Sequence, residues 1–323
     1  MSGGTTFDTE LASTTIDRYI SLQVKDQVFD EHTLLGWIER KVGIDRISGG
    51  HNVLITVGTA EDTTGGSYSG YDTFDTTPSE ALTNAVSGWK SYQQPITASY
   101  DEIARNSSPE GKIKIWKVRS DRALKSLRSK LNAHAHAASV GNSGKNIQGI
   151  GLLVDSAGTV QNIDRSTSTY WQANETAVSA ALAIDGSTGM RRMHTLCSTG
   201  SGDMSVPDGI MTDSDEYEAY EALLAPDIRF TSRTQGDGSF SGLAYRGAPI
   251  MWDADNVSGV MYFLNSETFE FYIDPERDFV TTEIARAMNG TLNQDAWSAQ
   301  ILWRGEFVIN EPRRNGKLTG LTD

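Results

Sequence analysis

The amino-acid sequence predicts an α+β fold organised around one long helix and one long hairpin. Three observations carry this prediction. Residues 109–138 are rich in helix-forming residues, residues 51–104 contain strand-like segments separated by a polar excursion, and the C-terminal third alternates with the period of strands. With 323 residues, 38% of them hydrophobic, the chain is long enough to bury a sizeable core.

Residues 16–41 are predicted to form a helical arm. Their first apolar residues recur at three- and four-residue spacing, the period of one helix face: Ile16, Tyr19, Ile20 and Val24. A second apolar group follows over residues 34–38 after a break near Asp30. Ser48-Gly49-Gly50 has the composition of a turn and ends the arm.

Residues 51–104 are predicted to form a long hairpin. Val53–Val57 has the β-branched composition of a strand, and Ile96–Tyr100 alternates with period two and is the predicted returning strand. The Gly/Ser/Thr-rich residues between 58 and 77 are too polar to build a core. Since a lone two-stranded hairpin is only marginally stable in water, we expect it to lie against another part of an assembly.

A long helix is predicted over residues 109–138. Ser107 and Glu110 fit a capping box, and Pro109 suits the first turn. One face is apolar, with Ser120 in its gap: Ile113, Trp116, Leu124, Leu127 and Leu131. At ~1.5 Å per residue such a helix is on the order of 40 Å long and could act as a strut.

The remaining elements are predicted from shorter patterns. Residues 147–154 are expected to form a strand, residues 174–184 an alanine-rich helix, and residues 213–224 a helix opened by Asp213 and Glu216. Three strands are then expected, the last with a bulge at Gly305: residues 260–264, 269–273 and 301–309.

Charge is distributed unevenly along the chain. The net charge is −14, yet residues 112–130 carry +7, which leaves −21 on the remainder. A solvated helix face would explain this run, and so would contact with an acidic partner. We favour compensation by the arm or hairpin of an adjoining copy over specific DNA binding, because a nucleic-acid-binding protein is usually basic overall.

No catalytic or cofactor-binding motif was found. Gly66–Gly70 and Gly238–Gly242 place an aromatic residue where a nucleophile elbow needs serine, and no phosphate loop or dinucleotide fingerprint is present. His134 and His136 have the wrong spacing for ligands on one helix face and are interpreted as solvated or capping residues. We therefore predict no catalytic residue, no metal site and no cofactor, and a protein that is not an enzyme.

The single cysteine and one acid-rich segment also have structural explanations. Cys197, the only cysteine, excludes an internal disulfide framework and is expected to be a small buried hydrophobe in a chain that stays in a reducing compartment. The acid-rich residues 213–216 lack the ligand periodicity of a calcium loop, so helix capping explains them better. No signal peptide or membrane-spanning segment is predicted.

The order of these elements resembles the major capsid proteins of tailed bacterial and archaeal viruses, which have the Hong Kong 97-type fold. Local phrases are also similar to that family, and they occur in its order: Gly49-Gly50, Gly70-Tyr71-Asp72, Trp89, Gly151-Leu152, Ile163-Asp164-Arg165-Ser166-Thr167, Tyr170-Trp171, Gly247-Ala248-Pro249-Ile250, Trp252-Asp253 and Met261-Tyr262-Phe263-Leu264-Asn265. The resemblance covers nearly the whole chain.

The resemblance implies a division of the chain into five parts. They are an N-terminal arm (1–50), an extended hairpin called the E-loop (51–104), the spine helix of a peripheral domain (105–145), a mainly axial domain (146–250), and strands shared by the two domains (251–323). The arm begins almost at Met1, so a scaffolding segment is expected on a separate protein, or not at all. No pair of residues for a covalent cross-link can be nominated.

The implied function is that of a major capsid protein. Copies would self-assemble as hexamers and pentamers into an icosahedral head that encloses double-stranded DNA without reading its sequence. The expected location is the virion after assembly in the host cytoplasm, with a scaffolding protein, a portal and a decoration protein as further candidate partners and no membrane contact. The alternative is another virion structural subunit, such as a tail-tube or adhesin protein.

Candidate contact residues follow from the basic helix and the hairpin. They are the residues expected to compensate charge or to touch neighbouring subunits: Lys112, Lys117, Arg119, Arg122, Lys125, Arg128, Tyr71 and Trp89.

Overall fold

The fold is that of a computed structural model, which describes residues 32–59, 66–73, 81–105, 109–198, 206–224, 243–286 and 295–322. Within 109–115 only the backbone is described. The predicted helix over 16–41 therefore lies partly outside the described residues. Its later part is helical, as α2 (Thr33–Trp37) followed by a π-helical turn (Ile38–Val42). Gly49 and Gly50 have φ of +85° and +84°, which suits glycine and confirms the predicted turn.

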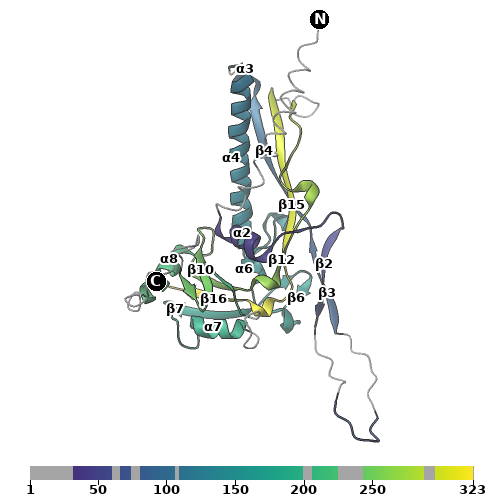
Figure 1. The fold of residues 1–323 in the computed structure, drawn as a ribbon, viewed down its shortest axis with the longest axis vertical. Coiled ribbons are helices and arrows are strands. Elements are labelled where there is room, and N and C mark those ends of the chain that lie inside the picture. Colours follow the sequence, from purple (N-terminus) through teal and green to yellow (C-terminus); the bar gives the residue numbers. More distant parts are fainter. Residues whose placement is uncertain are drawn as a thin grey trace.

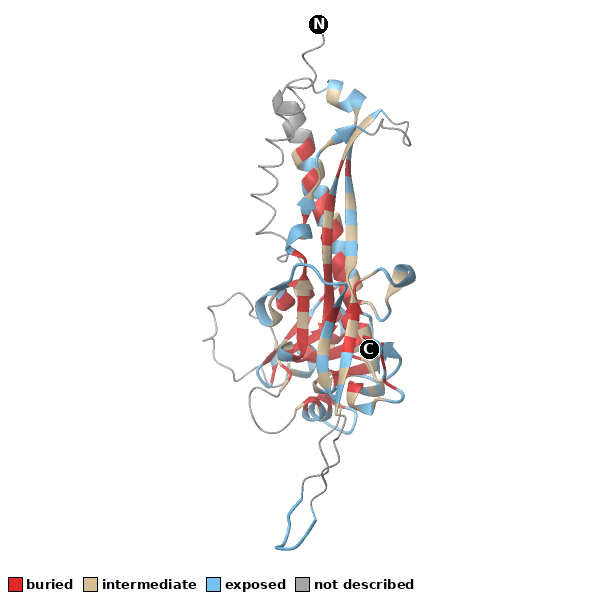
Figure 2. Cartoon of the chain, turned by 90° about the vertical axis from the view of Figure 1, so that its right-hand side faces the viewer, coloured by how far each residue is buried: buried red, intermediate tan, exposed pale blue. Residues whose placement is uncertain are grey.

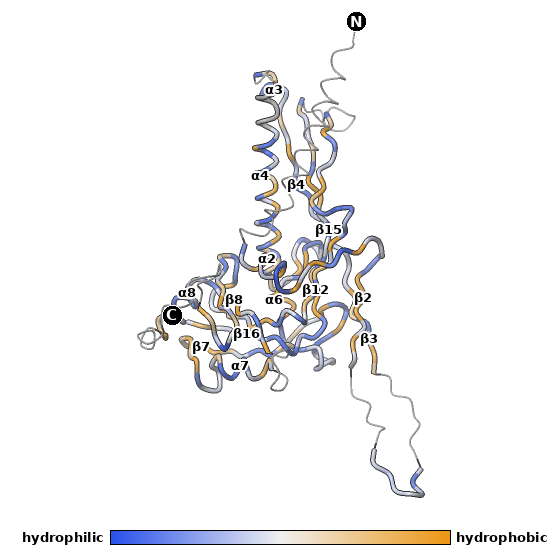
Figure 3. Tube along the Cα trace, in the orientation of Figure 1, coloured by the Kyte–Doolittle hydropathy of each residue, from blue (hydrophilic) through white to orange (hydrophobic). Residues whose placement is uncertain are grey.

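The long helix α4 (Pro109–His136) stands beside two long strands, β4 (Lys90–Ser99) and β15 (Ala296–Ile309), in a tall arm (Figure 1). The predicted helix is confirmed over 28 residues and ends two residues earlier than expected. Its capping box lies outside the described residues. Hydrophobic positions recur along α4 between hydrophilic ones (Figure 3), so that one face of the helix packs on the sheet.

Strand β15 is the central strand of a six-stranded sheet. One edge pairs antiparallel with β4, and the other edge carries three strands in succession: β14 (Ala285–Arg286), β13 (Val280–Thr281) and β12 (Phe269–Ile273). The short β1 (Asp45–Arg46) pairs with β12. The bulge predicted at Gly305 is wrong, because pairing runs through this residue without a register shift. Glycine is needed there for space, since a Cβ would lie 2.6 Å from the Trp303 ring.

A second six-stranded sheet forms the lower body of the molecule. Its strands lie in this order: β7 (Asn174–Ala180), β16 (Gly316–Leu321), β11 (Val260–Leu264), β8 (Gly209–Thr212), β10 (Ala248–Trp252) and β9 (Ala244–Tyr245). Two longer helices accompany it: α7 (Met190–Cys197) and α8 (Ser214–Leu224). The sheet is buried on both faces: Leu264 belongs to the core shared with α4 and β15, and Met261 to a second core that includes residues of α7 and α8.

Two secondary-structure predictions in this body are wrong. Residues 174–184 are not a helix; their first part is β7, which pairs parallel with β16, so tertiary pairing overrides the alanine content. Residues 147–154 are not a strand but contain the short helix α6 (Ile150–Leu153). A Cβ on Gly149 would lie 2.4 Å from the Ala137 carbonyl oxygen, so this glycine lets α6 approach the end of α4.

The hairpin is formed by β2 (Asn52–Gly58) and β3 (Leu82–Gly88), paired antiparallel over all seven residues of each strand. Both predicted strands are confirmed as strands, but their pairing with each other is wrong, because β2 pairs with β3. Residues 96–99 belong to β4, which turns away at Trp89 and pairs with β15 instead. The hairpin leaves the body on the side opposite the tip of α4 (Figure 1).

Short elements complete the described chain. The remaining helices are α3 (Tyr100–Arg105), α5 (Gly141–Gly144) and single 3-10 turns at Thr169–Trp171, Ser266–Thr268, Pro275–Arg277 and Pro312–Arg314; the remaining strands are β5 (Thr159–Val160) and β6 (Ile163–Asp164). Buried residues concentrate along β15 and its neighbours, whereas the described tip of the hairpin, residues 66–73, is exposed throughout (Figure 2). No helix among the described residues is both long enough and apolar enough to cross a bilayer.

Candidate functional site

Helix α4 presents two different faces. Its described apolar stripe is buried, as predicted, together with Ser120: Trp116, Leu124, Leu127 and Leu131. Of the basic candidates, Arg122 and Lys125 are exposed and Lys117 is half-buried, while the side chain of Lys112 lies outside the described residues. The exposed basic face is therefore shorter than the sequence implied.

Two basic residues of α4 have roles within the subunit. Arg119 donates to both carboxylate oxygens of Glu102 at 2.7 Å and to the carbonyl of Thr97. These contacts hold α3 and β4 against the helix. The Ser99 N–H and the Arg119 guanidinium together keep the pKa of the Glu102 carboxyl below its usual range. Arg128 is only 2% exposed, so it does not belong to a solvated face. Part of the positive charge is thus compensated or buried inside one chain.

The hairpin carries apolar side chains toward solvent. On one face of the two strands, Val53 and Ala85 are buried against the body. On the other face, Leu54 is 64% exposed and Leu82 is 73% exposed. At the tip, Tyr71 is fully exposed. Because burying apolar side chains of this size lowers the free energy, this face offers a partner apolar surface to cover.

Trp89 lies at the opposite end of the hairpin from Tyr71. The guanidinium carbon of Arg304 sits 5.2 Å from the centre of the Trp89 ring, a cation–π contact. Arg304 also donates to Asp274 at 3.2 Å. The two candidates therefore differ in position: Tyr71 is free at the tip, and Trp89 anchors the hairpin root to β15.

The interpretation of the two α4 histidines as solvated is wrong for His136, which is buried, while His134 is half-buried. His136 is 1% exposed; its Nδ1 lies 3.3 Å from the Asn256 amide oxygen and its Nε2 3.4 Å from Asp253. Nδ1 of His134 lies 2.9 Å from the Tyr92 hydroxyl. Nothing in the sequence spacing points to these partners, because they come from distant segments: β4 and the connection between β10 and β11.

Arg165 holds a loop together from within. It is fully buried and donates to four backbone carbonyls: those of Leu152, Leu153, Ala157 and Trp171. Burial lowers the pKa of its guanidinium to about 10, which still leaves the group charged at neutral pH. Residues 163–167 and 170–171, the two short segments that resemble the capsid family, are thus in contact through Arg165. Their spacing in the sequence does not indicate this contact.

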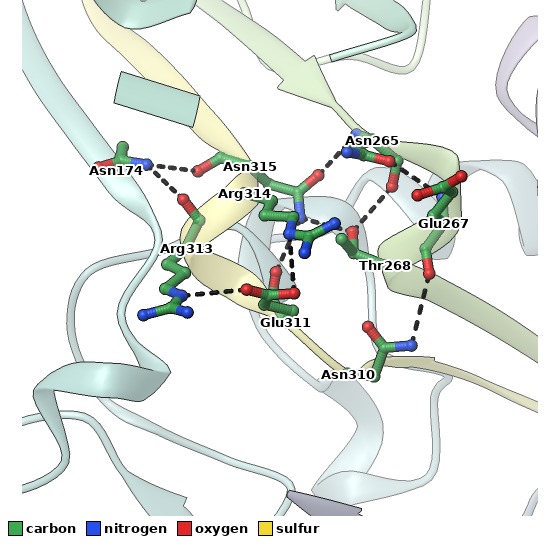
Figure 4. A network of polar contacts seen from close by, with 9 residues as sticks. All are labelled: Asn174, Asn265, Glu267, Thr268, Asn310, Glu311, Arg313, Arg314 and Asn315. Atoms are coloured by element: carbon green, nitrogen blue, oxygen red, sulfur yellow. Dashed lines mark hydrogen bonds and ion pairs between the residues drawn. The ribbon is translucent and has the colours of Figure 1, made fainter. Parts of the chain in front are cut away.

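A polar network connects the two sheets near the hairpin (Figure 4). Asn315, which is fully buried, donates to the Thr268 hydroxyl at 2.7 Å and accepts from the Asn265 N–H at 2.8 Å, while Glu311 binds Arg313 and Arg314. An open groove of about 580 Å³ lies beside this network, lined also by Thr56–Thr59 of the hairpin and by Tyr170.

The described residues contain no group of three or more His, Cys, Asp or Glu side chains arranged to hold a metal ion. Cys197 is fully buried, as predicted, and burial raises the pKa of its thiol to about 12, so it is not a thiolate nucleophile at neutral pH. Asp213 accepts the N–H of Glu216 at 3.2 Å, which confirms the predicted helix cap.

Comparison with known proteins gives no match by sequence and clear matches by structure. No protein-family model matches the chain, and no curated protein is similar to it in sequence. The fold is similar to that in the cyanophage A-1(L) capsid asymmetric unit, with a TM-score of 0.63 at 16% identity, covering 90% of this chain and 93% of that chain. It is also similar to the capsid of an empty GTA particle, with a TM-score of 0.59 at 11% identity over 88% and 90% of the two chains.

A third solved structure extends the comparison beyond viruses. The holo-SrpI encapsulin complex from Synechococcus elongatus PCC 7942 has a TM-score of 0.55 at 10% identity, covering 88% of this chain and 87% of that chain. All three matches span most of both chains. The chain therefore has the Hong Kong 97-type fold, which these phage-capsid and encapsulin structures share.

Proposed function

We propose that this protein is the major capsid protein of a tailed virus, which self-assembles as hexamers and pentamers into an icosahedral head around double-stranded DNA. The observation that carries the proposal is the β2–β3 hairpin, which projects from a body of capsid-type fold with Leu54 and Leu82 turned outward. A neighbouring copy that covered this face would remove apolar surface from water. Many such contacts, repeated by symmetry, would stabilise a closed shell.

Within this proposal the five parts of the chain keep their roles, except that β4 and α3 join the peripheral domain, because β4 pairs with β15 and α3 is held against α4. The hairpin of β2 and β3 is the E-loop, α4 is the spine of the peripheral domain with the β15 sheet, and the β11 sheet forms the axial domain. The exposed Arg122 and Lys125 of α4, with the half-buried Lys117, face acidic surface on adjoining copies. The net charge of −14 disfavours tight adhesion of DNA to the shell wall, so the DNA is enclosed and not bound by sequence.

The role is structural and not catalytic, and the location is the virion. A separate scaffolding protein, a portal and a decoration protein are the further partners proposed. A tail-tube or adhesin subunit is the alternative, and it is less well supported because the structures of similar fold are shells.

Electron microscopy of the purified protein tests the proposal. We expect polyhedral shells or ring-shaped capsomers for the unaltered chain. Leu54→Asp combined with Leu82→Asp should abolish them while leaving the circular dichroism spectrum and melting temperature unchanged, since both side chains are exposed in the isolated subunit. The matched control is Leu54→Val with Leu82→Val, which keeps the face apolar and should assemble.

Other outcomes would contradict the proposal. Stacked rings or tubes would favour the tail protein, and monomers under all conditions would exclude a shell. Particles isolated from their native source should contain nuclease-protected DNA. A shell filled with protein cargo and no DNA would refute the viral part of the proposal while keeping the shell.

A further inference from the structure

The root of the hairpin rests on a buried carboxyl group. Glu306 of β15 is fully buried, on the face of the strand opposite Phe307. Its Oε1 accepts the backbone N–H of Gln148 at 2.9 Å and that of Phe307 at 3.2 Å. The side-chain amide of Gln148 in turn donates to the Ser87 hydroxyl at 3.0 Å. Glu306 is therefore linked through one residue to Ser87, near the end of β3.

Two further hydrogen bonds connect β4, which follows the hairpin, to residues 144–147. Lys90, which follows the hairpin, donates to the Gly144 carbonyl at 2.6 Å, and the Tyr92 hydroxyl accepts the Ile147 N–H at 2.9 Å. The strand β15, the hairpin root and residues 144–148 therefore meet around one carboxyl group. The hairpin keeps further attachments that do not involve Glu306. The Val86 N–H donates to the Gln161 carbonyl at 2.8 Å, Ala85 is buried in the core, and the Trp89 ring contacts Arg304.

The charged groups around Glu306 do not neutralise it fully. From β4, the Lys90 ammonium and the Tyr92 phenol face it; from β12, its cross-strand partner is Tyr272; on β15, Arg304 lies two residues away and is engaged by Asp274 and Trp89. Beyond Tyr92 lies His134 of α4. Burial outweighs the Gln148 N–H and the Lys90 charge and raises the pKa of Glu306 to about 8.

We propose that Glu306 is a proton-operated hinge of the hairpin. When the carboxyl group is neutral, it stays dry and the hairpin root is held against β15. When it loses its proton, the charge is stabilised only if water reaches it, because an ionised carboxylate is costly in a buried site. Gln148 and Ser87 connect the group to β3, so water that reaches it parts these contacts, loosens the root and lets β2 and β3 swing about the Val86 attachment.

This inference concerns the single chain and does not depend on the proposed function. Its consequence is that the angle of the hairpin, and with it the direction of its apolar face, changes with pH. The proton acts as the ligand of this hinge. The equilibrium between the held and the loosened root shifts by the difference between the proton affinities of the two states.

Distance measurement between two labels tests the hinge. Leu82→Cys on β3 and Val280→Cys on β13 are exposed positions for spin labels, and the native Cys197 is fully buried and will not be labelled. Labelled chain is diluted into unlabelled chain so that only distances within one subunit are seen. The distance distribution should be single at acidic pH and change with a midpoint near pH 8.

Three variants make the result decisive. Glu306→Gln stays neutral and should keep the low-pH distribution at every pH. Lys90→Met removes the facing cation and should raise the midpoint, while Glu276→Gln, an exposed carboxylate in the same part of the fold, should behave as the unaltered chain. A distribution that never changes with pH, or one that changes equally in Glu306→Gln, would overturn the proposal.

Discussion

His136 and Asp253 form a buried ion-pair geometry between the end of α4 and the end of β10, with Nε2 and Oδ2 3.4 Å apart. The same carboxylate accepts the Asn132 amide at 3.0 Å and the Leu34 N–H of α2 at 3.3 Å. The Asp253 side chain therefore joins the long helix α4, the short helix α2 and the end of β10 in the second sheet. It fixes α4 and α2 against the end of β10.

Replacing His136 should destabilise the subunit strongly. His136→Ala removes a partner of the 6%-exposed Asp253 and leaves its charge poorly compensated, which typically costs about 3–5 kcal/mol. Urea denaturation followed by circular dichroism would measure the change in the free energy of unfolding. His51→Ala, at an exposed position, is the control and should change it by less than about 0.5 kcal/mol. Equal effects of the two substitutions would show that the junction is unimportant.

The stability of the subunit should fall in acid through Asp253. Burial alone would raise the pKa of this carboxyl, but the His136 side chain, the Asp255 N–H and the Asn132 amide hold it well below its usual range. A group whose pKa is lowered by folding stabilises the protein above its unfolded pKa of about 4, and this contribution is lost as the pH falls below that value. Asp253→Asn should be less stable at neutral pH and should lose less on acidification. An unchanged pH profile in chemical denaturation would contradict this.

Arg165 should not be replaceable by lysine. Its planar guanidinium serves four carbonyls at once, whereas an ammonium has three donors and a different geometry. We expect Arg165→Lys to lower the free energy of unfolding by roughly 2–4 kcal/mol, because buried carbonyls lose their donors. Arg277→Lys, at an exposed position, is the matched control for a thermal melt. A melting temperature unchanged in Arg165→Lys would argue against the clamp.

Charge reversal on α4 should affect assembly and not folding. Lys117→Glu with Arg122→Glu reverses the charge at one half-buried and one exposed position of the basic face, so repulsion from acidic neighbours should slow or prevent particle formation. The defect should diminish at high salt, because screening shortens the range of these interactions to about 3 Å at 1 M. Light scattering across a salt series measures the extent of particle formation, and the double variant Lys117→Arg with Arg122→Lys, which keeps both charges, is the control. Assembly that is indifferent to both charge and salt would exclude this role.

Several elements could be predicted because their signals are local. The α4 helix follows from helix-forming residues in one continuous amphipathic stretch, and the Asp213 cap from a pair three residues apart. Strand β2 follows from its β-branched residues, and β11 and β12 from alternation. In each case the residues that determine the structure are neighbours along the chain. The order of these elements was enough to anticipate the fold.

Other features were decided only by tertiary structure. Residues 174–180 pair with β16 and are a strand despite their alanines, and β4 leaves the hairpin for β15 because a longer apolar partner was available there. The partners of His136, Arg165 and Glu306 come from distant segments. Burial and pairing of this kind depend on which surfaces meet after the chain has folded, and no spacing within one element records them. The sequence by itself determined the elements and their order, whereas the packed structure decided which polar groups are buried together.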